Sequence, residues 1–114
     1  MAVVKFNRKI AIVQTAVASK RAAQELAAHI LANHLGACIQ IAPIRSLYRW
    51  RGKTESAGEY LVTVKTAART ADKCAAFIKI NHSYELPEII ITGAVADPAY
   101  ARWVARETSN NKGG

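Results

Sequence analysis

The sequence predicts an α+β fold in which two β-α-β halves pack both helices on one face of an antiparallel sheet. The chain has 114 residues, the usual size of one compact domain. Strand-like and helix-like patterns alternate in the order β-α-β-β-α-β, followed by a short helix. We therefore expect one domain over residues 1–114, a ferredoxin-like β-α-β-β-α-β sandwich with an extended hairpin and a C-terminal helix. Its core should span about residues 10–107, with a flexible tail over 108–114.

The first half of the domain begins with a short strand and a long helix. Residues 9–15 form an apolar run that is typical of a strand. Ser19 is a good N-cap for the next segment. Apolar residues then recur at helical spacing, which predicts a helix over 20–35. Gly36 follows this stripe, and we expect it to provide the left-handed C-terminal cap.

A long hairpin should follow this helix. Residues 37–50 read as a strand, and Pro43 inside it indicates a bend or an edge position, because proline cannot donate to a β-ladder. Residues 51–53 form the turn, and 59–66 alternate as the return strand. The first strand would be about 46 Å long at ~3.3 Å per residue, against ~34 Å for the breadth of such a domain. The hairpin should therefore overhang its own sheet and pair with another copy of the chain.

The second half repeats the strand and helix pattern. Thr70 can cap a helix that runs to about Ile80. Residues 88–95 are almost entirely aliphatic, the pattern of a strand covered on both faces. Asp97 and Pro98 should then begin a last short helix as N-cap and first-turn proline. The inner face of the second helix is expected to carry Ala71, Cys74, Phe77 and Ile78.

Basic residues are concentrated in the first half of the chain. The formal net charge is +8, and nine of the 16 Lys and Arg residues precede position 54, against a single acid there, Glu25. Such an excess makes an anionic partner the first class to consider. The excess centres on the hairpin, where strand alternation places Arg45, Leu47, Arg49 and Arg51 on one face and Ser46, Tyr48 and Trp50 on the other.

The hairpin pattern has two interpretations. Interleaved basic and aromatic residues are typical of surfaces that bind RNA or another anion. Alternatively, the aromatic face packs in an oligomer and the basic face stays in solvent. We favour the second interpretation.

Residues 81–88 concentrate polar groups between the second helix and the last strand. His82 and Glu85 suit a divalent metal ion, or they could place a general acid. The alternative is a structural corner in which both side chains hold backbone groups. The two cysteines, Cys38 and Cys74, lie far apart, which excludes a disulfide framework and points to the reducing cytoplasm. No nucleophile with a base, P-loop or dinucleotide motif is present, so we do not expect an enzyme.

Three stretches in this order resemble the CutA divalent-cation-tolerance family. They are Leu35-Gly-Ala-Cys38, Ser46-Leu-Tyr-Arg-Trp-Arg-Gly-Lys53 and His82-Ser-Tyr-Glu-Leu-Pro-Glu88. The resemblance implies a non-enzymatic, ferredoxin-like homotrimer joined through strand edges. It also implies a link to copper and other divalent ions and a likeness to PII signalling trimers.

The same resemblance defines the candidate sites. Members with proposed copper ligands carry a Cys and two His where this chain has Gln14, Asn81 and His82. His82 and Glu85 therefore remain as the candidate ligands for copper or another divalent ion, and we expect weak binding. The expected ligand cleft between subunits is lined by Tyr48, Trp50, Tyr84, Trp103, Arg45, Arg49 and Lys53.

Two other functions stay open at this point. In a PII-like protein, Arg45, Arg49 and Lys53 would select an anionic small molecule at clefts between subunits. An RNA-binding module using the hairpin is less favoured. No apolar run approaches the ~20 residues of a membrane span, so we expect no membrane partner.

Overall fold

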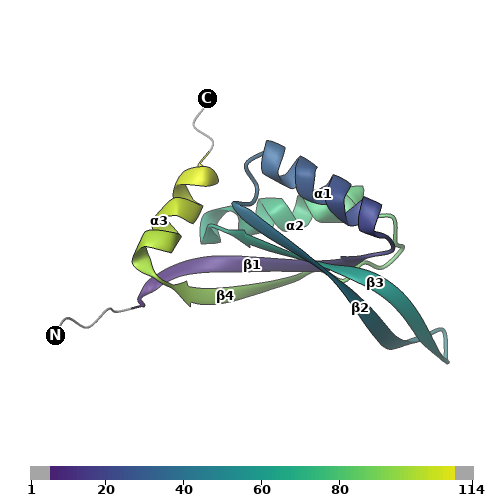
Figure 1. Ribbon diagram of the computed structural model, residues 1–114. Coiled ribbons are helices and arrows are strands. Elements are labelled where there is room, and N and C mark those ends of the chain that lie inside the picture. The colour runs from purple at the N-terminus through teal and green to yellow at the C-terminus, as the bar shows by residue number, and fades with distance from the viewer. Residues whose placement is uncertain (1–5, 110–114) are drawn as a thin grey trace.

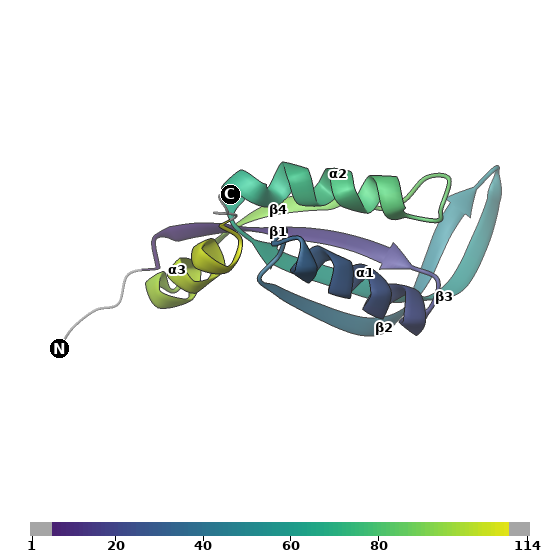
Figure 2. The same ribbon diagram turned by 90° about the horizontal axis from the view of Figure 1, so that it is seen from above.

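The computed structural model describes residues 6–109, which form a four-stranded antiparallel sheet with strand order β2-β3-β1-β4. Helices α1 and α2 lie side by side on one face of the sheet, and α3 lies at one end (Figures 1 and 2). The predicted ferredoxin-like α+β fold is confirmed. In chain order the elements are β1 (Arg8–Val17), α1 (Lys20–Ala32), β2 (Cys38–Trp50), β3 (Lys53–Thr66), the 3₁₀ turn η1 (Ala68–Thr70), α2 (Ala71–Asn81), β4 (Ile90–Ala96) and α3 (Pro98–Glu107).

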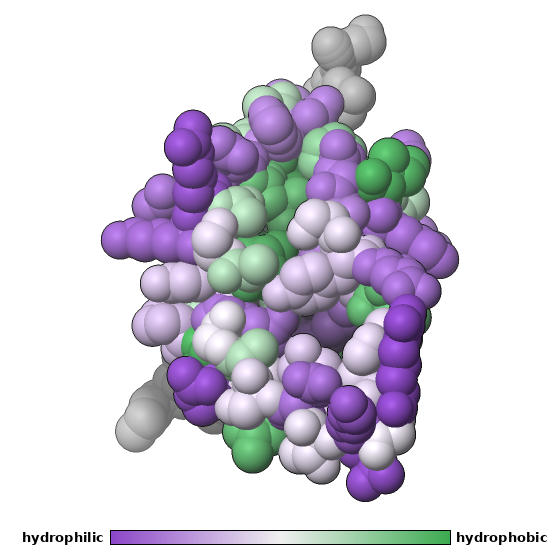
Figure 3. Space-filling model, turned by 90° about the vertical axis from the view of Figure 1, so that its right-hand side faces the viewer, coloured by the Kyte–Doolittle hydropathy of each residue, from purple (hydrophilic) through white to green (hydrophobic). Residues whose placement is uncertain are grey.

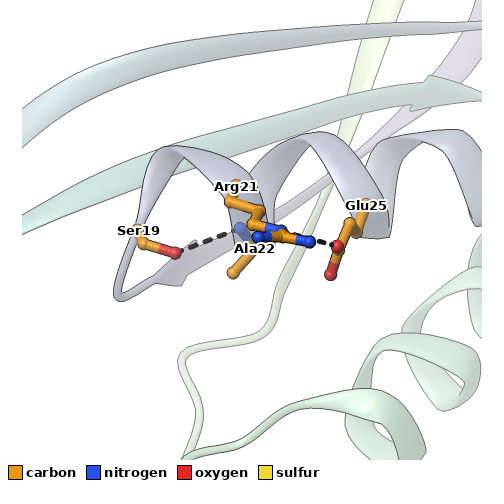
Figure 4. Close-up of polar contacts among 4 residues, drawn as sticks. All are labelled: Ser19, Arg21, Ala22 and Glu25. Atoms are coloured by element: carbon orange, nitrogen blue, oxygen red, sulfur yellow. Dashed lines mark hydrogen bonds and ion pairs between the residues drawn. The ribbon is translucent and has the colours of Figure 1, made fainter.

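Helix α1 begins as predicted and ends earlier than predicted. The Ser19 hydroxyl accepts a hydrogen bond from the Ala22 amide at 3.1 Å, and the ion pair of Arg21 with Glu25 lies on the exposed face (Figure 4). The helix ends at Ala32, and the left-handed residue after it is His34, with a φ of 56°. The predicted left-handed cap at Gly36 is therefore wrong.

Gly36 is required for close packing instead. A Cβ atom at this position would lie 2.5 Å from Cγ1 of Val64 and 3.1 Å from Cγ2 of Ile30. Both neighbours are fully buried. The core below α1 and α2 consists of Ala11, Val13, Val17, Ala23, Leu26, Ile30, Val62, Val64, Ala71, Cys74 and Ile78.

The hairpin overhangs its sheet as predicted. β1 pairs with β3 only from Tyr60 to Thr66, whereas β2 pairs with β3 along its full length. The outer part of β2 and β3 therefore forms an arm that extends beyond the helices (Figure 2). The described residues accordingly measure 54 Å along their longest axis. Pro43 lies in β2, an edge strand, as proline requires.

The turn of the arm explains why the return strand is longer than predicted. Arg51 and Gly52 both have positive φ, 51° and 79°, as in a two-residue type I′ hairpin turn. β3 therefore begins at Lys53 rather than at Glu59. Glu55, Ala57 and Gly58 are poor strand formers, and the pairing of this segment with β2 makes it a strand.

The second half differs from the prediction in two places. Thr70 precedes α2 but makes no side-chain cap bond, because the chain enters through η1. β4 is an edge strand of the sheet. Because α1 and α2 lie on one face of the sheet, the prediction that β4 is covered on both faces is wrong for the subunit. Ile90, Ile91 and Val95 are exposed there. The inner face of α2 is confirmed for Ala71, Cys74 and Ile78, with Phe77 partly buried.

Helix α3 begins as predicted. A carboxylate oxygen of Asp97 accepts a hydrogen bond from the Tyr100 amide at 3.0 Å, and Pro98 occupies the first turn. Ala101 and Val104 pack on Ile10 in a second small core. Of the predicted tail, Thr108 is buried and caps α3, and residues 110–114 lie outside the described part of the chain. Within residues 6–109, no helix has the length and apolar character that a bilayer span requires.

Candidate functional site

A cleft of about 990 Å³ lies between the hairpin arm and the segment that joins α2 to β4. The end of the molecule that carries the arm is mixed in character, with strongly hydrophilic residues mainly along its margins and residues of intermediate or hydrophobic character between them (Figure 3). The volume is at the upper end of the range for small-molecule sites. The cleft is lined by Ala16, Arg45, Ser46, Leu47, Tyr48, Arg49, Trp50, Glu59 and residues 83–88.

The structure brings most of the predicted cleft residues together in one subunit. Tyr48, Trp50, Tyr84, Arg45 and Arg49 all line the cleft, and so does Glu85 from the predicted metal pair. Three other predicted residues are not among its lining. Lys53 lies at the tip of the arm opposite Trp50, and Trp103 lies beside Tyr100 on α3 with ring centroids 5.6 Å apart. His82 begins the segment after α2, and its Nε2 contacts the carbonyl oxygen of Ala16.

His82 holds the segment against β1. Its Nε2 lies 2.8 Å from the carbonyl oxygen of Ala16, and its Nδ1 accepts a hydrogen bond from the Tyr84 amide at 3.1 Å. A carbonyl needs a donor and an amide needs an acceptor, so the two contacts together assign a neutral ring protonated at Nε2. Both ring nitrogens therefore have partners within the subunit, which agrees with the structural-corner interpretation of His82.

Glu59 is a cleft residue that the sequence reasoning missed. Its side chain lies at the inner end of the arm and is only 9% exposed. The hydroxyl of Tyr84 donates a hydrogen bond to Glu59 Oε2 at 2.8 Å. Burial of the phenol, with contributions from the Glu59 hydrogen bond and from the charges of Glu59 and Tyr48, raises the pKa of Tyr84 to about 12. The phenol is therefore neutral at physiological pH and remains a donor to Glu59.

Two further polar contacts define the rim of the cleft. Arg51 at the tip of the arm pairs with Glu85 at 3.3 Å, and its guanidinium lies 5.4 Å from the ring centroid of Trp50. Both charged side chains of this pair are exposed, so the ion pair is worth little in stability. Nε2 of Gln14 donates a hydrogen bond to Glu88 at 2.8 Å. The arm and the 83–88 segment thus face each other across the cleft.

The predicted metal ligands lack further ligands in the same subunit. In the part of the chain that the structure describes, no group of three His, Cys, Asp or Glu residues is arranged to hold a metal ion. Glu85 is engaged by Arg51, and both nitrogens of His82 are engaged by backbone groups. Cys38 and Cys74 are free thiols, and burial raises the pKa of Cys74 to about 11, which keeps that thiol protonated and unreactive.

Comparison with known proteins decides the family. A family model described as CutA1 divalent ion tolerance protein matches residues 11–107. The chain belongs to the CutA1 divalent ion tolerance family. The three motifs that resembled this family all lie within the matched residues, so the resemblance inferred from them is confirmed. The name of the CutA1 family refers to divalent-ion tolerance and not to a catalysed reaction.

Relatives of this chain occur in plants, animals and bacteria. The chloroplastic protein CutA of Arabidopsis thaliana is 34% identical over 103 residues, covering 87% of this chain and 56% of that protein. The divalent-cation tolerance protein CutA of Thermus thermophilus is 31% identical over 99 residues, covering 85% of this chain and 96% of that protein. The chain thus spans about half the length of its plant and mammalian relatives.

Solved CutA structures have the same fold. CutA from Synechococcus elongatus superposes with a TM-score of 0.87 at 28% identity, covering 95% of this chain and 97% of that chain. The periplasmic divalent cation tolerance protein CutA from Archaeoglobus fulgidus superposes with a TM-score of 0.84 at 26% identity, covering 89% and 99%. The names of these relatives place members of the family in the chloroplast and in the periplasm.

Proposed function

We propose that this CutA1 chain serves divalent-cation tolerance as a non-enzymatic homotrimer in the cytoplasm. The observation that carries the trimer is the apolar edge of β4, where Ile90, Ile91 and Val95 are exposed in the subunit. An exposed aliphatic edge strand is an aggregation hazard unless another chain covers it. The free thiols of Cys38 and Cys74 support a reducing compartment.

The topology supports a closed ring of subunits. The sheet ends in β2 on one side and in β4 on the other. Pairing β2 of one copy with β4 of the next is a head-to-tail contact, which forms a ring when the rotation between copies closes. The resemblance to the CutA family implies that this ring contains three copies. The overhanging arm would extend beyond its own sheet toward a neighbouring copy.

Light scattering on the purified chain tests this assembly. We expect a mass near three times 12.4 kDa at micromolar concentration. A monomeric mass under these conditions would contradict the proposed trimer.

We further propose that the 82–88 segment binds copper or another divalent ion weakly through His82 and Glu85. Imidazole nitrogen and carboxylate oxygen both suit Cu(II) and Zn(II). A metal that reaches Nδ1 of His82 must displace the hydrogen bond from the Tyr84 amide, and a metal on Glu85 competes with Arg51. Both competitions lower the affinity, which is why we expect weak binding.

Calorimetry with Cu(II) and Zn(II) tests the metal proposal. Substitution His82→Ala should lower the affinity at least about tenfold, since even a residue that merely supports a ligand typically contributes that much. His29→Ala is the matched control, because His29 is an exposed imidazole on α1 outside the cleft. Equal affinity in the native chain and the His82→Ala variant would remove His82 from the site.

A further inference from the structure

Among residues 6–109, the carboxylate of Glu59 has no cationic partner. Glu59 is nine-tenths buried, and its single hydrogen bond among the described residues comes from the Tyr84 hydroxyl. The ion pairs formed within residues 6–109 use other carboxylates, those of Glu25 and Glu85. A buried carboxylate is costly unless a cation or several donors compensate it. The cleft therefore contains an acceptor that no cation from the described part of the chain compensates.

The hairpin register places the arm's aromatic side chains on the same face as Glu59. Ile44 is directly opposite Glu59, so Ser46, Tyr48 and Trp50 share its face of the arm. Arg45 and Arg49 also line the cleft but belong to the opposite face by alternation. Nη1 of Arg45 donates a hydrogen bond to Ser56 Oγ at 3.0 Å, and Ser56 lies on that opposite face too. The two arginines therefore do not compensate Glu59.

The remaining lining also favours a positively charged group. Three carboxylates line the cleft, and those of Glu85 and Glu88 are already held by Arg51 and Gln14. Among the described residues, no Arg or amide side chain contacts the third carboxylate, that of Glu59. The rings of Tyr48 and Tyr84 add faces that attract cations, and the Trp50 ring already has the Arg51 guanidinium 5.4 Å from its centroid.

We propose that the cleft binds a small organic cation with N–H donors, a guanidinium or a primary ammonium, anchored on Glu59. The free oxygen of Glu59 accepts the cation's hydrogen bond, and the aromatic rings contact its apolar part. The neutral phenol of Tyr84 orients the carboxylate through its hydrogen bond and brings no opposing charge. Every lining residue used here comes from one subunit, and binding requires no metal ion.

Calorimetric titration with methylguanidinium and propylammonium, followed in parallel by the NMR signal of the Trp50 indole, tests the site. We expect saturable binding of one cation per subunit, and no binding of methylurea, the neutral analogue of similar shape. Glu59→Gln keeps the size of the side chain and removes its charge, and it should weaken binding roughly tenfold to a hundredfold, as expected for loss of a charge-assisted hydrogen bond. Glu25→Gln is the matched control, because Glu25 is an exposed carboxylate on α1, and it should bind as the native chain does.

Three results would overturn the proposal. The first is equal affinity in the native chain and in Glu59→Gln. The second is binding of methylurea as tight as that of methylguanidinium. The third is that neither cation binds while Glu59→Gln weakens subunit assembly, because a basic side chain of a second copy would then fill the cleft. Light scattering on the same samples measures the trimer mass independently of cation binding. Failure of the cation proposal can therefore be distinguished from failure of the proposed trimer.

Discussion

Substitution Ile90→Lys should convert the trimer largely to monomer at micromolar concentration. Ile90 is 48% exposed on β4 in the subunit, and the proposed assembly covers it with the neighbouring copy. Loss of this apolar contact costs roughly 1.5–3 kcal/mol per site, and the lysine adds the cost of burying a charge. Each trimer contains the substitution three times, so the effect on assembly is large. Sedimentation or light scattering across a concentration series measures it.

Ile80→Lys is the matched control for this experiment. Ile80 is 82% exposed on α2 and belongs to neither edge strand, so the same change there should leave the trimer intact. If Ile90→Lys remains trimeric at the concentrations at which Ile80→Lys does, β4 is not part of the interface.

Substitution Gly36→Ala should destabilise the subunit although it adds only one methyl group. The new Cβ would meet Val64 at 2.5 Å and Ile30 at 3.1 Å, and both side chains are fully enclosed by the core. Overpacking of this kind costs about 1–3 kcal/mol, which outweighs the ~0.4–1 kcal/mol that alanine contributes by restricting the unfolded chain. Denaturant unfolding at one fixed protein concentration measures the free energy, because subunit association also affects apparent stability.

Gly58→Ala provides the comparison for Gly36→Ala. A Cβ at Gly58 would have Arg45 Nη2 as its nearest neighbour at 3.8 Å, the end of a flexible side chain. We expect its free energy of unfolding to stay within about 0.5 kcal/mol of the native value. If the two variants have the same free energy of unfolding, the close approach at Gly36 does not limit stability.

The elements could be predicted because their local patterns are unambiguous. The helical stripe of α1, the Ser19 cap and the Asp97 cap each depend on residues close in sequence. The overhanging arm could be predicted from strand length alone. The resemblance to the family was also visible, because its three motifs are contiguous stretches of chain.

The missed features depend on residues that are distant in sequence. The role of Gly36 depends on Val64, a residue of β3, so the rule that glycine caps helices selected the wrong position. The aliphatic pattern of β4 is the same whether its cover comes from the subunit's own helices or from another copy. The pattern therefore predicts a covered strand without saying which chain covers it.

The sequence singled out several residues that line one cleft, and it did not single out Glu59. The aromatic residues of the arm and Tyr84 stand out in the sequence and do line one cleft. Glu59 gives a weaker signal, a carboxylate within an alternating strand, and only the fold shows that it is buried beside Tyr84. His82 looked like a ligand by residue type, whereas its two hydrogen bonds to backbone groups become visible only in the fold.

Amide hydrogen exchange along β4, resolved residue by residue, tests most directly whether strand edges join the subunits. Alternate amides of residues 90–96 face away from β1, and no strand formed by residues 6–109 of the same subunit lies beside them, since β4 is the edge of the sheet. The proposed trimer pairs these outward amides with a strand of the next copy. We expect them to exchange as slowly as the inward amides of β4. Fast exchange of the outward amides in a sample of trimeric mass would contradict assembly through this edge.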